Sequence, residues 1–256
     1  MQIHGRRDTL NPHFDIHILF FFFIAYSFLG WCLEVLFHIY TQKKFINRGF
    51  LHGPVCPIYG SGAVLMILFL TPLQGNLLYL FVGGVVVATL LEYVTGYVLE
   101  LAFDTKWWDY SKEPLNIKGY ICLRFSLAWG IAGVFLMKIL HPTIEKIILA
   151  IPEVVEGHLY TLLLIVFVVD VTLTINSLIE FRKILKELVA IKAELNKKIK
   201  DKDLLLARRK ERAYLRLRKR HIRFLRIYPS LTKGKFSDLI HDMKNRMEKE
   251  IKKVSK

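Results

Sequence analysis

Five ionisable residues lie within long apolar stretches of this 256-residue chain: Glu34, Glu92, Glu100, Arg124 and Asp170. An ionised side chain surrounded by hydrocarbon is costly, so such residues face protein or water and often mark functional sites. Glu92 and Glu100 are eight residues apart, with Gly96 midway, and therefore share one helix face. We expect Glu34, Glu92 or Glu100, and Arg124 to form an ion-paired cluster. A purely structural clamp between helices is the alternative.

Two connections between apolar stretches carry dense Gly, Pro and Asn residues. The first, over residues 48–62, reads RGFLHGPVCPIYGSG, and the second contains KWWDYS and LNIKGYICLRF. These residue types specify backbone shape, and loops of defined shape on a rigid frame often carry function. The candidate residues in the two motif loops are Arg48, Gly49, Gly53, Pro54, Cys56, Pro57, Tyr59, Gly60, Trp108, Asp109, Tyr110, Ser111, Asn116, Gly119 and Cys122.

Catalytic chemistry has little support in these motifs. Cys56, Cys122 and His52 would lie near one membrane face, but their spacing matches no established metal pattern. Asp109 beside two tryptophans is better explained as a carboxylate that caps loop amides than as an acid or base. The chain has no phosphate-binding G-x-x-x-x-G-K-[ST] loop, which excludes an ATP-hydrolysing subunit. We expect no catalytic residue, no metal site and no cofactor, and hence no enzyme.

The apolar stretches predict an all-α, polytopic integral membrane protein, because a helix needs about 20 apolar residues to cross a bilayer. Hydrophobic residues make up 53% of the chain, which is high for a soluble protein. We predict five spans, over residues 17–40, 55–70, 77–101, 120–140 and 159–179. The second is short and interrupted by Pro57 and two glycines, so a re-entrant segment, leaving four spans, is the alternative. Residues 141–151 are predicted to form an amphipathic interfacial turn or helix.

The predicted domains are an N-terminal segment (1–16), a transmembrane domain (17–179) and a basic helical tail (180–256). The tail carries 26 of the 37 lysines and arginines and 10 of the 22 acidic residues, so it accounts for the net charge of +15. Positively charged segments stay on the cytoplasmic side. With five spans, this puts the C-terminus in the cytoplasm and the N-terminus outside the cell membrane.

The connecting loops agree with this orientation. The connection after the first span contains Lys43, Lys44 and Arg48, and the connection after the third contains Lys106, Lys112 and Lys118, so both would be inside. The uncharged loop 71–76 and the acidic connection near residues 145–156 would be outside. Lys138, at the outer end of the fourth span, would reach the interface by snorkelling.

The tail has three competing interpretations. Attraction to anionic lipid of the inner leaflet is the simplest, because each basic residue near such a surface contributes about 1 kcal/mol. An apolar seam of Phe181, Ile184, Leu188, Ile191 and Leu195 makes a protein partner or a homo-oligomer the second. Nucleic-acid binding is not expected, since no recognition fold accompanies the charge. The stretch 208–226 is basic and amphipathic, and Ser237 is placed to cap a last helix.

The motif strings resemble those of a family of small multi-pass membrane proteins described as putative ABC-transporter type IV. The resemblance covers roughly residues 19–140 and rests on five strings: GWxxE at 30–34, RGFLxGPxCPIYG at 48–60, LEYxTGxxLE at 91–100, WWDYS at 107–111 and NIxGxICL at 116–123. One departure is Tyr120, where relatives commonly have Arg. If that Arg has a role, Arg124 would have to take it.

The resemblance implies a permease-like or accessory transport component, with a cytoplasm-facing polar site formed by spans one, three and four and both motif loops. A non-transporting membrane scaffold or regulator that acts through the basic tail is the alternative, and an intramembrane enzyme comes third.

Overall fold

The computed structural model describes residues 15–43, 47, 49–103, 106–197 and 212–213. The predicted N-terminal segment, Lys44, Arg48 and the tail features at 208–226 and 237–254 therefore lie wholly or almost wholly outside the described residues. The chain divides into two compact units: residues 1–95 with 110–172, and residues 96–109 with 173–256. Each is described by itself below.

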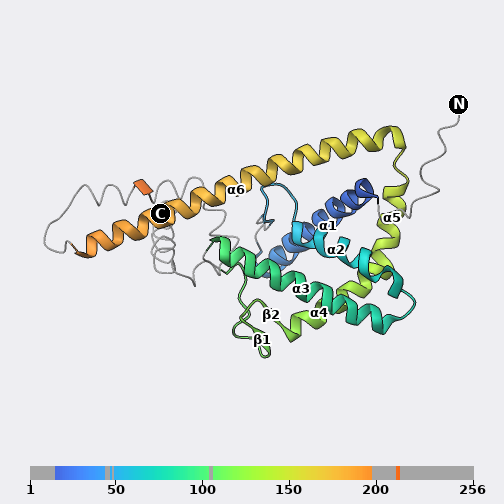
Figure 1. The fold of residues 1–256 in the computed structure, drawn as a ribbon, viewed down its shortest axis with the longest axis horizontal. Helices are drawn as coiled ribbons and strands as arrows, with labels where there is room; N and C mark the ends of the chain where they lie inside the picture. Colours follow the sequence, from blue (N-terminus) through green and yellow to red (C-terminus); the bar gives the residue numbers. More distant parts are fainter. Residues whose placement is uncertain (1–14, 44–46, 48, 104–105, 198–211, 214–256) are drawn as a thin grey trace. The chain divides into compact units, whose positions relative to one another are not determined.

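The protein is mainly α-helical, as predicted (Figure 1). The helices are α1 (Ile16–Gln42), α2 (Pro57–Leu70), α3 (Leu77–Phe103), α4 (Leu123–Phe135), α5 (His141–Leu149) and α6 (Glu153–Lys197), with a 3₁₀ turn η2 (Thr71–Leu73) and a π-helical turn η3 (Leu136–Leu140). Two short strands, β1 (Asn116–Ile117) and β2 (Ile121–Cys122), form an antiparallel hairpin.

Four helices are long and apolar enough to cross a membrane: Ile16–Thr41, Leu77–Phe103, Leu123–Leu149 and Glu153–Ile191. They correspond to the predicted first, third, fourth and fifth spans. The predicted second span is α2, whose 14 residues extend about 21 Å at 1.5 Å per residue. That is less than the roughly 30 Å of a hydrocarbon core.

Local chemistry sets where several helices begin and end. The Asp15 carboxylate accepts a hydrogen bond from the His17 backbone N–H at 2.8 Å and caps α1, which ends at Lys43 in the left-handed conformation. Pro57 starts α2, where its missing N–H is harmless. The Asn76 side chain accepts from the backbone N–H of Leu78 at 2.9 Å and so caps α3.

The π turn joins α4 to α5 without a break, so that residues 123–149 form one apolar helical stretch. Pro142 explains the turn, because a proline cannot donate to the carbonyl four residues earlier and its ring clashes with that carbonyl. The predicted helix at 141–151 is thus present as α5. It packs against α1, and the hydroxyl of Tyr26 lies 3.1 Å from His141 Nδ1 in the buried interior.

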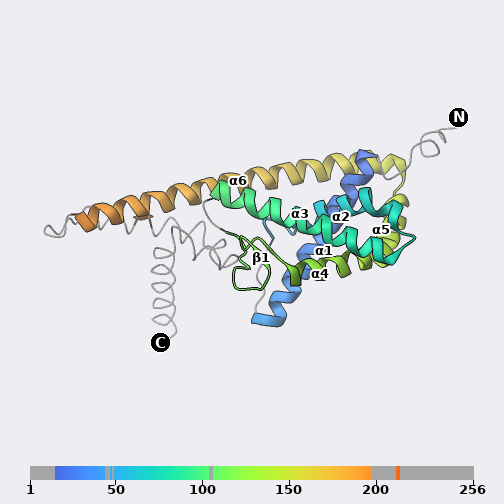
Figure 2. The ribbon, with the colours of Figure 1, turned by 60° about the horizontal axis from the view of Figure 1, so that its bottom comes forward.

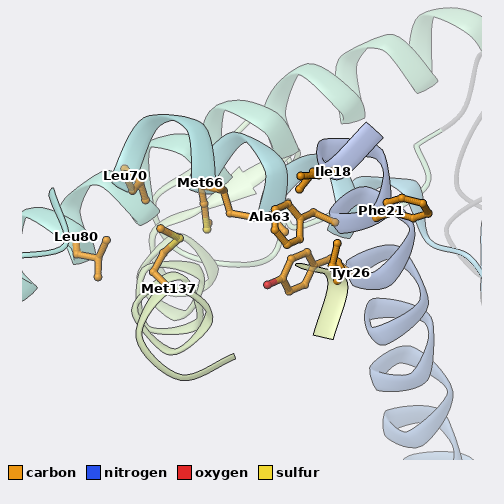
Figure 3. Packing of buried hydrophobic residues seen from close by; sticks show 11 residues of the cluster. Ile18, Phe21, Tyr26, Ala63, Met66, Leu70, Leu80 and Met137 are labelled. Atoms are coloured by element: carbon orange, nitrogen blue, oxygen red, sulfur yellow. The ribbon is translucent and has the colours of Figure 1, made fainter. Parts of the chain in front are cut away.

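The core of the first unit is formed mainly by α1, α2, the start of α3 and η3. Figure 3 shows side chains of these elements meeting around Met66 and Met137, with Tyr26 of α1 beside them. In both ribbon views α1 lies alongside α2 (Figures 1 and 2). Phe20 and Phe23 of α1 also contact Phe167 of α6 edge to face, with ring centroids 6.2 and 5.2 Å apart.

Small residues allow the helices to approach closely. A methyl group at Gly60 of α2 would collide with the Ser27 hydroxyl and the Phe23 carbonyl of α1. Gly84 of α3 faces Gly130 and Gly133 of α4, so that here two backbones meet directly. In lipid there is no hydrophobic driving force between helices, so van der Waals contact between closely approaching backbones stabilises their packing.

We predict that Gly60→Ala destabilises the protein by about 1–3 kcal/mol, because one methyl group overfills the α1–α2 contact. Thermal unfolding of the detergent-solubilised full chain measures the effect. Gly157→Ala in α6 is the matched control, since a methyl group there meets nothing within 4 Å. Equal melting temperatures for the two variants would contradict the packing shown here.

Candidate functional site

Two carboxyl groups, those of half-buried Glu34 and buried Glu92, each accept a hydrogen bond from a tyrosine of a motif loop. Tyr59, in the first turn of α2, donates to Glu34 Oε1 of α1 at 2.7 Å. Tyr110, in the second motif loop, donates to Glu92 Oε1 of α3 at 3.0 Å. A hydrogen bond to an ionisable acceptor is among the stronger kinds. We call these four residues the tyrosine–carboxylate cluster.

Aromatic rings join the two pairs. The Tyr59 ring meets Trp129 of α4 edge to face, with centroids 5.8 Å apart, and the Trp129 indole N–H lies close to the Glu92 carboxyl. Tyr110 stacks on Phe125 of α4 at 4.7 Å. Tyr59 and Tyr110 are near enough to interact electrostatically. Residues from both motif loops therefore meet at one end of the first unit.

Tyr110 is held as a hydrogen-bond donor. Its burial, and then the neighbouring Glu92 carboxylate, raise the pKa of the Tyr110 phenol far above its usual value. The phenol consequently stays protonated over the physiological pH range and donates to Glu92 throughout.

Arg124 has a different partner from the one predicted. Its Nη1 lies 3.7 Å from Glu113 Oε2 within the second motif loop, and its side chain is 74% exposed. Its guanidinium also lies over the Phe125 ring, 5.7 Å from the centroid. Glu34 and Glu92 therefore have tyrosine hydroxyls as partners where an ion pair with Arg124 was predicted. The reason is that Arg124 lies in the first turn of α4 and its side chain is directed toward Glu113 of the loop.

Glu100 belongs to the second unit, as do Trp108 and Asp109, and is described apart from the cluster. It lies on α3 two residues before Ala102, whose carbonyl accepts a hydrogen bond from Arg182 Nη1 of α6 at 2.6 Å. Trp107 is buried in this unit, edge to face with Phe103.

The first motif loop is shaped by a residue that the sequence analysis left without a role. Both carboxylate oxygens of Asp170, in α6, accept backbone hydrogen bonds, from His52 at 2.9 Å and from Gly53 at 2.8 Å. The His52 ring lies 3.7 Å from the same carboxylate. A side chain at Gly53 would press on Asp170, which explains the glycine in this motif.

Asn47, also not predicted, organises the same loop. Its side-chain oxygen accepts from the Trp31 indole at 2.7 Å and from the Gly49 N–H at 3.0 Å, and its amide donates to the His52 carbonyl at 2.9 Å. Farther along, the Cys56 N–H donates to the Ser27 carbonyl of α1 at 3.0 Å. Pro54 lies exposed between these anchors, and buried Cys56 directly precedes α2. These hydrogen bonds set the backbone shape of the described part of the first motif loop.

Asn116 plays the corresponding part in the second motif loop. Its amide donates to the Glu113 carbonyl at 2.8 Å and to the Ser111 carbonyl at 3.4 Å, and its oxygen accepts from the Gly119 N–H at 3.1 Å. Lys118 and Gly119 both have positive φ, at 52° and 72°, and form the tight turn of the β1–β2 hairpin. The strand pairing places buried Cys122 at the start of α4.

Tyr120, the departure from the family pattern, is buried and meets Tyr93 of α3 edge to face, with ring centroids 5.4 Å apart. It fills an interior position, so in this chain the position serves packing. Among the described residues, no group of three or more His, Cys, Asp or Glu side chains is placed to hold a metal ion.

The model of the family described as putative ABC-transporter type IV matches residues 21–175. The chain belongs to this family. The match extends beyond the range 19–140 expected from the motifs and takes in the first half of α6, including Asp170, which anchors the first motif loop. No curated protein and no solved structure matches the chain.

We predict that Asp170→Ala loosens the first motif loop, since two charge-assisted hydrogen bonds of about 1.5–3 kcal/mol each are lost. Cys56 is only 5% exposed in the unmodified protein. Its maleimide labelling rate should be at least severalfold higher in Asp170→Ala than in the unmodified protein. Cys122, buried in the second motif loop, is the internal reference and should not change. A parallel rise at both cysteines would instead indicate general unfolding.

We predict that Arg124→Gln changes the stability of the protein by less than about 1 kcal/mol, because its ion pair with Glu113 is largely solvent-exposed. Thermal unfolding measures this. Glu92→Ala, made in parallel, leaves the Tyr110 hydroxyl without its acceptor and opens a cavity at a buried position, so it should have the larger effect. If Arg124→Gln lowered the melting temperature more than the Glu92 variant does, the result would support the ion-paired cluster predicted from the sequence.

Proposed function

We propose that this protein is a permease-like or accessory transport component whose polar site is the tyrosine–carboxylate cluster. The observation that carries the proposal is the meeting of Glu34, Tyr59, Glu92 and Tyr110 within a bundle of membrane-spanning helices. Buried ionisable groups in such a bundle are costly and characteristically serve solute or ion pathways. Family membership supports a transporter-related role.

The site faces the cytoplasm in this proposal, with the N-terminus outside and the basic tail inside. Tyr59 lies in the first turn of α2 and Tyr110 lies within the second motif loop. The lysines near them in the sequence favour the cytoplasmic side. At the opposite end of the first unit, Lys138 Nζ donates to the Gln74 carbonyl of the uncharged loop at 2.6 Å. A chain of this kind requires a separate ATPase if its transport consumes ATP, because it has no phosphate-binding loop of its own.

The test is counterflow of radiolabelled amino acids, sugars and organic cations in proteoliposomes that contain the full chain. We expect at least one solute to exchange faster than in empty vesicles. Glu92→Gln and Tyr110→Phe should each slow this exchange about 10- to 100-fold, the equivalent of one hydrogen bond to a charged group. Arg124→Gln is the matched control and should leave the exchange unchanged.

The second candidate function is a membrane scaffold or regulator, and α6 is the observation that favours it. This helix has 45 residues and extends about 68 Å, roughly twice what a bilayer crossing needs. Beyond residue 173, the apolar seam of Phe181, Ile184, Leu188 and Ile191 is buried within the second unit, whereas nothing is described of the Leu195 side chain. Copurification of a fixed partner, lost on truncation of the tail, without solute exchange in proteoliposomes would favour this role.

A further inference from the structure

One oxygen of Glu92 is buried without a hydrogen bond. The Glu92 side chain is 7% exposed, and its Oε1 accepts from Tyr110 at 3.0 Å. Its Oε2 has no hydrogen-bond partner within the described part of the chain. An unmade hydrogen bond at a buried polar atom is unfavourable and calls for a ligand or a changed charge state.

The groups that face Glu92 offer no positive charge. They are Tyr110 of the second motif loop and Trp129 of α4. The groups that in turn act on Tyr110 are Glu34 of α1, Tyr59 of α2 and Cys122 of the second motif loop, and none of them is a cation. Arg124, the basic side chain closest in sequence to Trp129, is exposed and paired with Glu113. Burying an ionised carboxylate with no countercharge is far less favourable than burying a neutral carboxyl. For the neutral group, leaving one polar atom without a hydrogen bond costs only a few kcal/mol of folding free energy.

The surroundings fit a proton better than a metal cation. Ca²⁺ takes six to eight oxygen ligands, and Mg²⁺ needs an octahedral set. The groups directed at Glu92 are instead donors: the Tyr110 hydroxyl points its proton at Oε1, and an indole N–H such as that of Trp129 has no lone pair to offer. Donors repel a metal ion but are compatible with a carboxyl that gains and loses a proton.

We propose that Glu92 is a proton-binding site, carrying its proton on Oε2 in the resting protein. A proton from water adds to Oε2 and leaves a neutral carboxyl, whose Oε1 is the carbonyl oxygen and still accepts from Tyr110. On release the proton returns to water, and the resulting carboxylate is held by the Tyr110 and Trp129 donors. Tyr110 is a positioning residue, and through it the second motif loop senses the charge of Glu92.

If the protein transports a solute, the proton on Glu92 would be the coupling ion, and this coupling role rests on the proposed function. The protonation of Glu92 itself does not depend on transport. Glu34 lies on the more accessible side of the cluster, since it is half-buried whereas Glu92 is buried. The carboxyl that holds the proton is thus the more secluded of the two.

Infrared difference spectroscopy of the full chain in lipid nanodiscs tests the proposal. At neutral pH we expect a protonated-carboxyl C=O band that is absent in Glu92→Gln. The band should be retained in the control Glu113→Gln, because the Glu113 carboxylate is paired with the exposed Arg124 side chain. Tyr110→Phe should shift this band to higher wavenumber, because the hydrogen bond to the carbonyl oxygen is lost. The band should lose intensity as the pH rises.

A second measurement on the unmodified sequence covers the case in which Glu92→Gln fails to fold. Dicyclohexylcarbodiimide reacts with protonated carboxyls in apolar surroundings, and peptide mass spectrometry should locate the adduct on Glu92, with a yield that falls as the pH rises. Absence of both the band and the adduct would overturn the proposal. Protection of Glu92 by sodium or potassium chloride at constant pH would also overturn it in favour of a metal cation.

The outcomes separate this proposal from the proposed function. A protonated Glu92 in a protein that exchanges no solute would leave the proton site standing and remove the transport role. Solute exchange without a protonated Glu92 would do the reverse.

Discussion

The arrangement of the first unit depends on one constraint: a carboxyl group on an apolar helix must find hydrogen-bond partners inside the protein. Glu34 and Glu92 find theirs in Tyr59 and Tyr110, which come from separate parts of the chain. Satisfying the two carboxylates therefore fixes where α2 begins and where the second motif loop folds back. Polar groups that would be a liability in lipid thus define the geometry of the bundle.

Each motif loop is organised by an asparagine whose side chain forms hydrogen bonds with backbone N–H and C=O groups of the loop. Asn47 and Asn116 each satisfy backbone groups a few residues away, and Asp170 adds two further acceptors for the first loop. Loops built this way are held in place instead of being solvated spacers. The tyrosines are consequently presented from supports whose backbone is held by side-chain hydrogen bonds.

Much of the helical layout could be predicted from the sequence, because hydropathy and length are local properties. The first and third spans are found within two residues of the predicted ends. The partner of Arg124 could not be predicted, since spacing brings residues to one end of a bundle but does not decide which side chain turns toward which. The role of Asp170 was missed for the same reason: its partners are backbone amides almost 120 residues away. The Lys118–Gly119 pair is a local signal for the turn of the β1–β2 hairpin. Two-residue strands are too short to show the alternating pattern by which a strand is predicted.

The limited length of α2 has a consequence for the surrounding lipid. A helix of about 21 Å followed at once by a polar turn leaves that end of the bundle several ångströms short of a full hydrocarbon thickness. Lys138 reaches toward the same turn, and a primary ammonium brings water and headgroups with it. The bilayer should therefore be thinner on this side of the first unit, and headgroups and water should lie closer to the buried core there than along the other helices.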